Sequence, residues 1–338
     1  MKAAYYAEKH SMRIGECRPI EPAAGEVQIR VSHCGICGTD LHIYHGHMDH
    51  RVKMPQVIGH EMSGTIAAIG PGVTAWKSGD RVNVRPLDYC GECPACQAGH
   101  SHICQKLKFI GIDVPGAMQS LWTVPARTLH RLPDNLTLEQ AALIEPIAVA
   151  CHDVRLGEVK AGDYCVVLGG GPIGLLVALV AKAEGANVLI SEINPFRLKL
   201  AAELGIPAVN PSEIDLPALV EKETGAAGAD VVFEVSGSAA AAEMMTKLPR
   251  TRGRIVMVAI HAQPPKVDLF RFFWRELRLI GARVYEAEDF DKAIHLASIH
   301  AFPLARIVTR TVPMEDINAA FDEMQRGGEV MKILVRCD

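Results

Sequence analysis

Four closely spaced cysteines are the first residues in this 338-residue chain that could do chemistry. They lie in the segment Cys-Gly-Glu-Cys-Pro-Ala-Cys and shortly after it, and they are Cys90, Cys93, Cys96 and Cys104. Four thiolates at such spacing suit a tetrahedral zinc ion whose coordination is closed. Two disulfides or four unrelated buried thiols are the poorer interpretation, because the N-terminus lacks the apolar core of a secretory signal. We predict a structural zinc at 90–104 that stabilises a lobe and cannot bind substrate.

Three other segments carry further candidate metal ligands. They are the run 34–42 with Cys37, a Gly-His-Glu segment with His60 and Glu61, and a Leu-Ile-Glu-Pro segment with Glu145. Each alone is weak evidence, because a cysteine can be a small core residue and a single histidine is more often structural. The last segment lies where a β-rich half of the sequence meets a nucleotide-binding half, a usual place for a ligand site. Together the segments indicate a second metal.

A glycine-rich turn between a strand and a helix is a candidate dinucleotide site. The apolar run Tyr164–Leu168 is followed by Gly-Gly-Gly-Pro-Ile-Gly and by a helical pattern at 175–183. In this motif the glycines allow the turn, the approach of backbone N–H groups to a pyrophosphate, and close helix packing. A plain glycine-rich turn would not need these flanking elements. The predicted cofactor contacts are Gly169, Gly171, Pro172, Ile173 and Gly174.

A carboxylate at the end of the next apolar run indicates which dinucleotide is bound. Glu192 follows the run 188–191, close to the ~20-residue distance expected for a residue that accepts both ribose hydroxyls. Its charge would repel a 2′-phosphate, so NAD is favoured over NADP. A solvated strand end is the alternative interpretation. Arg197 is a weaker candidate for the ribose edge, since it could also be an ordinary helix surface residue.

The apolar pattern divides the chain into two expected domains. Residues 1–146 are often interrupted by glycine and proline and are typical of a mostly-β domain. Residues 147–286 alternate short apolar runs with helical segments, which predicts βαβ units around a buried parallel sheet. Helical spacing then recurs at 289–298 and 314–326, before a β-like run at 330–335. We assign residues 287–338 to the first domain.

Several of these motifs, in this order, resemble the zinc-containing alcohol dehydrogenases of the medium-chain dehydrogenase/reductase superfamily. The likeness covers nearly the whole chain and is carried by Cys37-Gly-Thr-Asp-Leu-His42, Gly59-His-Glu61, the four-cysteine lobe and the glycine-rich turn. The runs 35–44 and 144–146 are most similar to the polyol (sorbitol), 2,3-butanediol and L-threonine dehydrogenases. The resemblance implies an α/β protein with a GroES-like, mostly-β catalytic domain and a Rossmann cofactor domain on a doubly wound parallel sheet.

The resemblance also implies roles for single residues at a catalytic zinc. Cys37 and His60 become zinc ligands, and Glu61 and Glu145 become the carboxylates at the metal, with the direct ligand between these two left open. Asp40 would accept a hydrogen bond that fixes the His60 ring. Capping a helix that begins near Leu41 is a second and compatible role for Asp40.

The implied reaction is the oxidation of a secondary alcohol to a ketone. Zinc would lower the pKa of the alcohol, and hydride would pass from the alkoxide to C4 of NAD. Thr39 would receive the proton and His42 would pass it to solvent. As alternatives, Thr39 is a packing residue and His42 one member of a polar loop. Three more histidines on that loop, a solvated cluster that could bind stray metal, receive no function: His45, His47 and His50.

Composition excludes several other kinds of function. The net charge is −4 and the basic residues are scattered, which argues against nucleic-acid binding. No apolar run reaches the ~20 residues that a membrane span needs. We expect a cytoplasmic enzyme with a small-molecule substrate, two zinc ions per chain and NAD, and the resemblance implies a homodimer or homotetramer.

Two alternatives belong to other functional classes. A zinc-free quinone or enoyl reductase of the same superfamily would need neither Cys37 and His60 nor the four-cysteine lobe. A non-catalytic NAD-binding protein could keep the fold without activity, but the complete ligand set with Thr39 and His42 argues against such a loss. A polyol, a vicinal diol and a 3-hydroxy amino acid all remain possible substrates.

Overall fold

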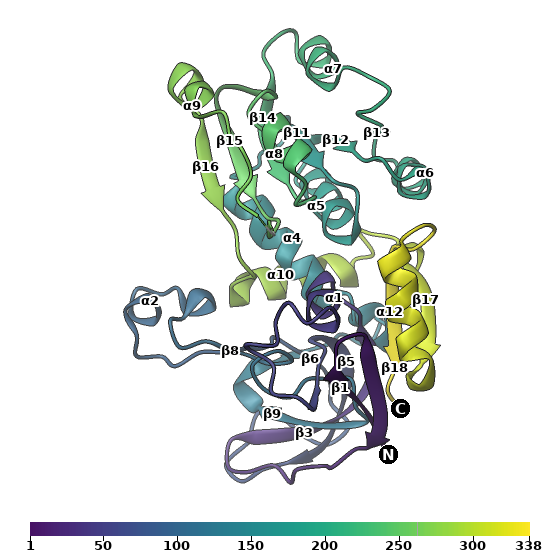
Figure 1. Ribbon diagram of the computed structural model, residues 1–338. Coiled ribbons are helices and arrows are strands. Elements are labelled where there is room, and N and C mark those ends of the chain that lie inside the picture. The colour runs from purple at the N-terminus through teal and green to yellow at the C-terminus, as the bar shows by residue number, and fades with distance from the viewer. Residues whose placement is uncertain (262) are drawn as a thin grey trace. The chain divides into compact units, whose positions relative to one another are not determined.

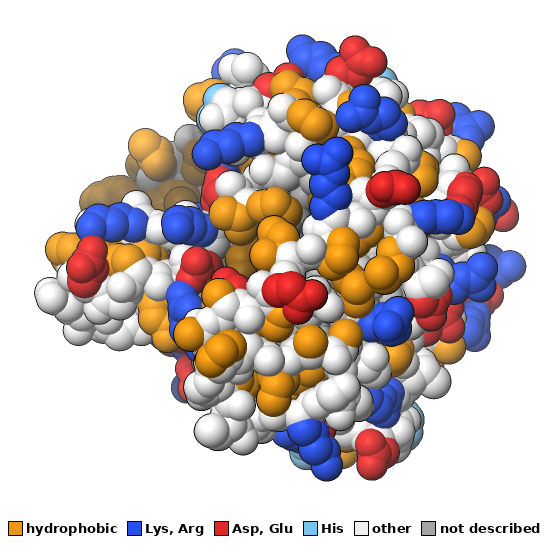
Figure 2. Space-filling model, turned by 90° about the horizontal axis from the view of Figure 1, so that it is seen from below, with side chains coloured by type: hydrophobic (Ala, Val, Ile, Leu, Met, Phe, Trp, Pro, Cys, Tyr) orange, Lys and Arg blue, Asp and Glu red, His pale blue; other side chains and the backbone are white. Residues whose placement is uncertain are grey.

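The computed structural model describes residues 1–261 and 263–338 and divides them into two units. Unit 1 contains Met1–Glu145 and Glu286–Asp338, and unit 2 contains Pro146–Tyr285. No helix within the described ranges is long and apolar enough to cross a membrane. On the face shown in Figure 2, basic and acidic side chains are interspersed with hydrophobic ones.

Unit 2 is built on a six-stranded parallel sheet with the order β13-β12-β11-β14-β15-β16 (Figure 1). The strands are β11 (Tyr164–Leu168), β12 (Asn187–Ser191), β13 (Ala208–Val209), β14 (Ala229–Glu234), β15 (Pro249–Met257) and β16 (Arg278–Gly281). The helices are α4 (Ile144–Leu156), α5 (Pro172–Ala183), α6 (Pro195–Glu203), α7 (Leu216–Glu223), α8 (Ala239–Met244) and α9 (Leu269–Arg275). The order reverses direction at β11, the arrangement of a doubly wound sheet, which confirms the predicted βαβ architecture.

Short polar side chains fix where the helices of unit 2 begin. At the starts of α6, α7, α8 and α9, a side-chain oxygen accepts a backbone N–H of the first helical turn, and the capping residues are Asn194, Asp215, Ser238 and Asp268. Each such cap stabilises a helix by about 1 kcal/mol. The α5 helix instead begins with Gly171 and Pro172 and has no side-chain cap, so its first N–H groups are left for a ligand.

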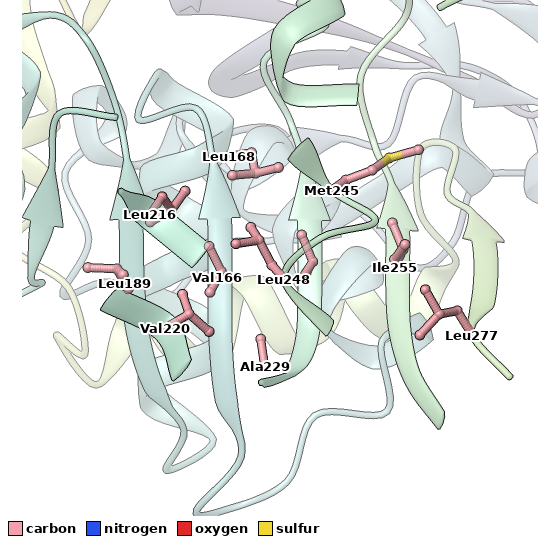
Figure 3. Packing of buried hydrophobic residues seen from close by; sticks show 11 residues of the cluster. Val166, Leu168, Leu189, Leu216, Val220, Ala229, Met245, Leu248, Ile255 and Leu277 are labelled. Carbon is pink, nitrogen blue, oxygen red and sulfur yellow. The ribbon is translucent and has the colours of Figure 1, made fainter. Parts of the chain in front are cut away.

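Branched and long aliphatic side chains fill the space between this sheet and its helices. Val166 and Leu168 of β11 and Leu189 of β12 pack with residues of α7 and of the neighbouring strands (Figure 3). All three are almost completely buried. Because the strands are covered on both faces, they appear in the sequence as continuous apolar runs rather than alternating ones.

Unit 1 is mostly β and holds a sheet with the order β10-β6-β5-β3-β18-β17, with β9 also paired to β3. Its strands are β3 (Glu26–Gly35), β5 (Glu61–Ile69), β6 (Arg81–Val84), β9 (Leu121–Pro125), β10 (Leu129–Arg131), β17 (Val308–Pro313) and β18 (Lys332–Arg336). A three-stranded sheet contains β2 (Ser11–Glu16), β1 (Lys2–Glu8) and β4 (Gln56–Val57), and a pair joins β7 (Leu87–Asp88) to β8 (Lys108–Phe109).

The C-terminal segment contributes to the same sheet of unit 1. Strand β18 pairs antiparallel with β3, with Leu334 opposite Gly35 and Val335 opposite Cys34. The helices of the unit are α1 (Gly38–Tyr44), α2 (Pro94–Gln97), α3 (Leu138–Ala141), α10 (Ala287–Ser298), α11 (Leu304–Ile307) and α12 (Ile317–Arg326). The helical pattern at 314–326 is only partly an α-helix, since Met314–Asp316 is a 3-10 turn.

Candidate catalytic and cofactor sites

The register between β3 and β5 brings three predicted metal ligands together. Gly35 at the end of β3 pairs with Glu61 at the start of β5, directly after His60, while Cys37 precedes the first residue of α1. The ligand atoms of Cys37, His60 and Glu61 all lie within 4.8 Å of one another. A Cβ atom at Gly35 would lie 2.2 Å from Oε2 of Glu61, so a side chain there would displace the carboxylate. Glycine is therefore required beside this group.

Two buried polar atoms support the view that this group fits a metal ion. Oδ1 of Asp40 and Nδ1 of His60 lie 3.7 Å apart, and neither has a hydrogen-bond partner among the described residues. Such atoms are rare in a folded protein. If these two atoms moved slightly closer, Nδ1–H of His60 would donate a hydrogen bond to Oδ1 of Asp40. Nε2 of His60 would then be left to bind a cation, which is the usual arrangement of a metal-bound histidine. A thiol, an imidazole and a carboxylate are donors that zinc accepts.

Asp40 also has a structural task. The α1 helix begins at Gly38, so the expected start after Asp40 is wrong. Asp40 is instead the third helical residue, and its Oδ2 accepts the N–H of Cys37 at 2.9 Å. One carboxylate thus fixes the backbone of one candidate ligand and faces the ring of another, because its two oxygens point to different partners.

Charges around the group alter the pKa of its members. Burial would lower the pKa of His60, but the carboxylate of Asp40 and the side chain of Cys37 raise it well above its usual value. Burial also raises the pKa of Asp40. Several acidic groups thus share a buried position that a cation would stabilise.

Lys332 is the site residue that sequence reasoning missed. Its Nζ donates to both carboxylate oxygens of Glu61, at 2.8 and 2.7 Å, and to the carbonyl of Ile36 at 3.2 Å. Both side chains of the ion pair are almost completely buried. The available signal was a lysine inside the apolar run Val-Met-Lys-Ile-Leu-Val, where a buried charge requires a partner.

Glu145 lies at the first turn of α4 and is also buried, with 4% of its surface exposed. Its charge raises the pKa of both His60 and Lys332. Its oxygen atoms are not part of the group whose ligand atoms lie within 4.8 Å of one another in the described part of the chain. Glu61 is therefore the carboxylate that joins Cys37 and His60.

The two predicted proton carriers lie on α1. Thr39 is half-buried, whereas His42 is exposed on the last turn of the helix. Nδ1 of His42 lies 3.5 Å from Nδ1 of His47. Burial and the neighbouring His47 lower the pKa of His42.

The four cysteines of the lobe converge. Their ligand atoms lie within 4.8 Å of one another, with Sγ–Sγ distances of 3.7 Å for Cys93–Cys104 and 3.5 Å for Cys90–Cys104. These distances exclude a disulfide bond of ~2.05 Å. They are near the ~3.8 Å that separates two sulfurs on one tetrahedral zinc with Zn–S of ~2.3 Å.

Backbone N–H groups point at these sulfurs. The N–H of Cys90 donates to Sγ of Cys104, and the N–H of Cys93 donates to Sγ of Cys90, both at 3.4 Å. Backbone hydrogen bonds from Cys96 and Gln105 lower the pKa of Cys93 to about 6. Cys93 is thus favoured as a thiolate, the form that binds metal, whereas burial raises the pKa of Cys96 to about 12.

The predicted dinucleotide loop has the local geometry that its glycines imply. Gly169 has a φ of 109°, which favours glycine, and a Cβ atom at Gly174 would lie 1.9 Å from the carbonyl oxygen of Gly169. Pro172 and Ile173 form the first turn of α5. The loop therefore presents backbone N–H groups at the carboxyl end of β11.

Glu192 follows β12 beside this loop. Its Oε2 accepts the N–H of Gly170 at 2.8 Å, and its Oε1 accepts the N–H groups of Ile193 and Asn194 at 2.7 and 2.9 Å. Arg197 on α6 lies 3.6 Å from the same carboxylate, and its guanidinium is the nearest group to the open side of Gly171. The loop, Glu192 and Arg197 thus form one group within unit 2.

Two family models match the chain. The alcohol dehydrogenase GroES-like domain matches residues 23–134, and the zinc-binding dehydrogenase model matches residues 172–298. The first covers most of the β-rich part of unit 1, and the second begins within the glycine-rich turn, at the start of α5, and continues through the rest of unit 2.

Characterised relatives match over almost the full length. The chain is 56% identical over 338 residues, covering 100% of it and 99% of the relative, to 2-dehydro-3-deoxy-L-galactonate 5-dehydrogenase of Pseudoalteromonas atlantica. It is 34% identical over 322 residues, 93% of each chain, to sorbitol dehydrogenase of Halalkalibacterium halodurans. The crystal structure of 2R,3R-butanediol dehydrogenase from Bacillus subtilis matches with a TM-score of 0.92 and 33% identity, covering 100% of this chain and 99% of that one.

Proposed function

Because the chain belongs to the zinc-binding, GroES-like alcohol dehydrogenase family, we propose that it oxidises a secondary hydroxyl of a sugar acid to a ketone with NAD. The chain is an oxidoreductase of the alcohol and polyol dehydrogenase type, as its motifs predicted. Its GroES-like and Rossmann domains are those that the resemblance implied. A zinc-free reductase or a non-catalytic protein would not require the buried Cys37, His60 and Glu61 group, which is the observation that carries the proposal.

Cys37, His60 and Glu61 would hold the catalytic zinc, with Glu145 as the second carboxylate nearby. A zinc ion in this place supplies Lewis-acid polarisation, which lowers the pKa of a substrate hydroxyl. Asp40 would orient the His60 ring through Nδ1, which lies 3.7 Å from Oδ1 of Asp40. Lys332 compensates the charge of Glu61, which limits how strongly this carboxylate donates to a cation.

Thr39 and His42 would carry the proton away from the substrate hydroxyl. Thr39 can accept it at Oγ1 while donating its own proton onward. His42 is exposed and its lowered pKa keeps the ring neutral near pH 7, so it can accept a proton and release it to solvent.

The loop 169–174 and Glu192 would bind NAD, which supplies a hydride-accepting ring. The uncapped start of α5 provides N–H groups for the pyrophosphate. Oε2 of Glu192 accepts one backbone N–H and retains a lone pair that can accept a ribose hydroxyl, whereas Oε1 already accepts two backbone N–H groups. Arg197 would lie at the edge of that ribose.

The substrate class rests on the relative with 56% identity, which acts on a 2-dehydro-3-deoxy sugar acid at C5. The test is NADH formation by purified enzyme with 2-dehydro-3-deoxy-L-galactonate, compared with sorbitol, 2,3-butanediol and L-threonine. We expect kcat/KM for the sugar acid to exceed the others by at least ~100-fold, since lost polar contacts in a specific site cost about 3 kcal/mol or more. Higher kcat/KM on any of the other three would contradict the sugar-acid proposal but keep the reaction type.

The metal content can be measured independently of activity. We infer two zinc ions per chain, one at Cys37 and one in the lobe, and a cytoplasmic location, where reduced thiols persist. Elemental analysis of Cys37→Ser is expected to give one zinc per chain, with NADH binding retained and turnover abolished. Two zinc ions in that variant, or normal turnover, would refute the ligand assignment.

We also infer that the protein forms a homo-oligomer through one edge of unit 2. Strand β16 ends the parallel sheet, and the neighbouring α9 exposes Phe270, Phe273 and Trp274 to solvent. Ile260 is 78% exposed although Val256 of the same apolar stretch is buried, so this stretch divides between core and surface. An edge strand can pair with its own copy about a two-fold axis, which would cover these side chains.

A further inference from the structure

The last turn of α1 and the loop after it carry a pair of histidines that the proposed reaction only partly uses. Nδ1 of His42 and Nδ1 of His47 lie 3.5 Å apart, with ring centroids 5.8 Å apart. The N–H of His47 donates to the carbonyl of His42 at 2.9 Å, so the backbone holds the two rings in this relation. The ring of His45 lies 5.7 Å from that of His47 and is fixed by Gln325 at 3.1 Å.

We propose that His42 and His47 form a surface site for a divalent transition-metal ion, and that occupancy of this site inhibits the enzyme. Two nitrogens at ~2.0–2.1 Å from one tetrahedral zinc are separated by about 3.4 Å, close to the distance between these Nδ1 atoms. Imidazole nitrogen suits Zn²⁺, Ni²⁺ and Cu²⁺ rather than Mg²⁺ or Ca²⁺. With two protein nitrogens from His42 and His47, water would complete the coordination.

Two features determine how tightly such an ion binds. Burial and mutual proximity favour the neutral form of the His42 ring, and a neutral ring is the form that binds metal. Both rings are exposed to solvent, so water competes with them for the ion. The site is therefore weaker than the two buried thiolate-containing sites and can be emptied without disturbing them.

Inhibition follows from the proton route and so rests on the proposed function. A metal ion bound at Nδ1 of His42 occupies the lone pair that would accept a proton on that side of the ring. It also adds positive charge beside the group that must become cationic. Metal at this site therefore slows the release of the substrate proton without contacting substrate or NAD.

The test titrates the tag-free holoenzyme with Ni²⁺, following binding by calorimetry and turnover by NADH formation. The test variant is His47→Ala, and the matched control is His50→Ala, an exposed histidine of the same turn. We expect wild type and the control to bind Ni²⁺ and lose turnover together. His47→Ala should weaken both effects by at least about tenfold, since even indirect changes at metal sites cost ~10–100-fold in affinity.

The possible outcomes test the proposed metal site and the proposed reaction separately. Equal Ni²⁺ affinity in His47→Ala and wild type would overturn the site. Binding that depends on His47 but leaves turnover unchanged would overturn the inhibition and count against His42 as proton carrier. Binding that depends on His47 in a protein without dehydrogenase activity would keep the site and contradict the proposed function instead.

Discussion

The buried ion pair between Lys332 and Glu61 makes the candidate metal-binding group of Cys37, His60 and Glu61 dependent on one residue far away in the sequence. Removing one member of a buried pair leaves an uncompensated charge, at a cost of about 3–5 kcal/mol. Lys332 is held by β18 beside β3, while Glu61 begins β5. Strand pairing therefore places the positive charge of Lys332 beside the candidate metal ligands.

We predict that Lys332→Gln lowers the free energy of unfolding by about 3 kcal/mol when the protein is depleted of zinc, because Glu61 then has no cation. Added zinc should restore part of the loss, since the ion replaces the ammonium. Urea unfolding with and without chelator measures both quantities. Lys247→Gln is the matched control, because its partner Glu243 is exposed and such pairs contribute under ~1 kcal/mol. Equal losses in the two variants would show that Glu61 does not need Lys332.

A second prediction concerns Glu192 and the choice of cofactor. Glu192→Gln removes the charge that opposes a 2′-phosphate and keeps the size of the side chain. The ratio of kcat/KM for NAD to that for NADP should fall by at least about tenfold, which corresponds to ~1.4 kcal/mol. Steady-state kinetics with both cofactors measures it, with the exposed Glu213→Gln as control. An unchanged ratio would remove Glu192 from the ribose site.

The residue types in the sequence predicted the candidate metal ligands better than they predicted the residues that hold those ligands in place. Cys37, His60 and Glu61 stood in motifs with recognisable ligand types, and the structure brings them together. Lys332 had no motif, because its importance comes from a strand register that cannot be read locally. The part played by Glu145 in metal binding stays a prediction.

At the scale of elements, the short lobe between β7 and β8 depends on its four sulfurs. Its α2 helix has four residues and none of them is buried, so packing contributes little to its order. If the four sulfurs bind zinc as proposed, the ion would be the main source of stability for this segment.

We predict that the lobe loses zinc only as the pH falls below about 6, the pKa of Cys93 without metal, because a bound cation keeps the thiolates deprotonated to lower pH. The folded-state pKa is lowered, so the thiolate and the stability linked to it are present at higher pH and disappear as this group is protonated. Zinc release followed with a chromogenic chelator between pH 8 and pH 4 measures the transition. Cys104→Ser should remove this phase and leave NADH binding unchanged. Retention of all lobe zinc at pH 4 would contradict the assignment.

Strand positions were easier to predict than helix starts and ends. The run Tyr164–Leu168 is β11 without a change at either end, because continuous apolar residues mark a strand covered on both faces. The start of α1 was misplaced, since Cys37 caps it through its backbone position and Asp40 acts from within the first turn. The 3-10 turn at Met314–Asp316 shares the spacing of an α-helix closely enough to be missed.

At the scale of the whole molecule, the exposed aromatic side chains of α9 are the feature that a single chain leaves unexplained. Phe273 is 77% exposed and Trp274 is 71% exposed, next to the last strand of the sheet. Contiguous apolar surface of this kind usually marks an interface. A second copy is the occupant that matches an open sheet edge.

We predict that Phe273→Glu shifts the protein towards a monomer of 36.6 kDa, because a charge would be buried without a partner at the two-fold contact. Light scattering after size exclusion, at several protein concentrations, measures the mass. Ile299→Glu is the matched control, since this residue is also apolar and exposed but belongs to unit 1. A wild type that is already monomeric at micromolar concentration would contradict the proposed assembly. If Ile299→Glu dissociated the protein instead, the contact between copies would lie on unit 1. The exposed aromatic side chains of α9, beside β16, would then not be explained by the assembly.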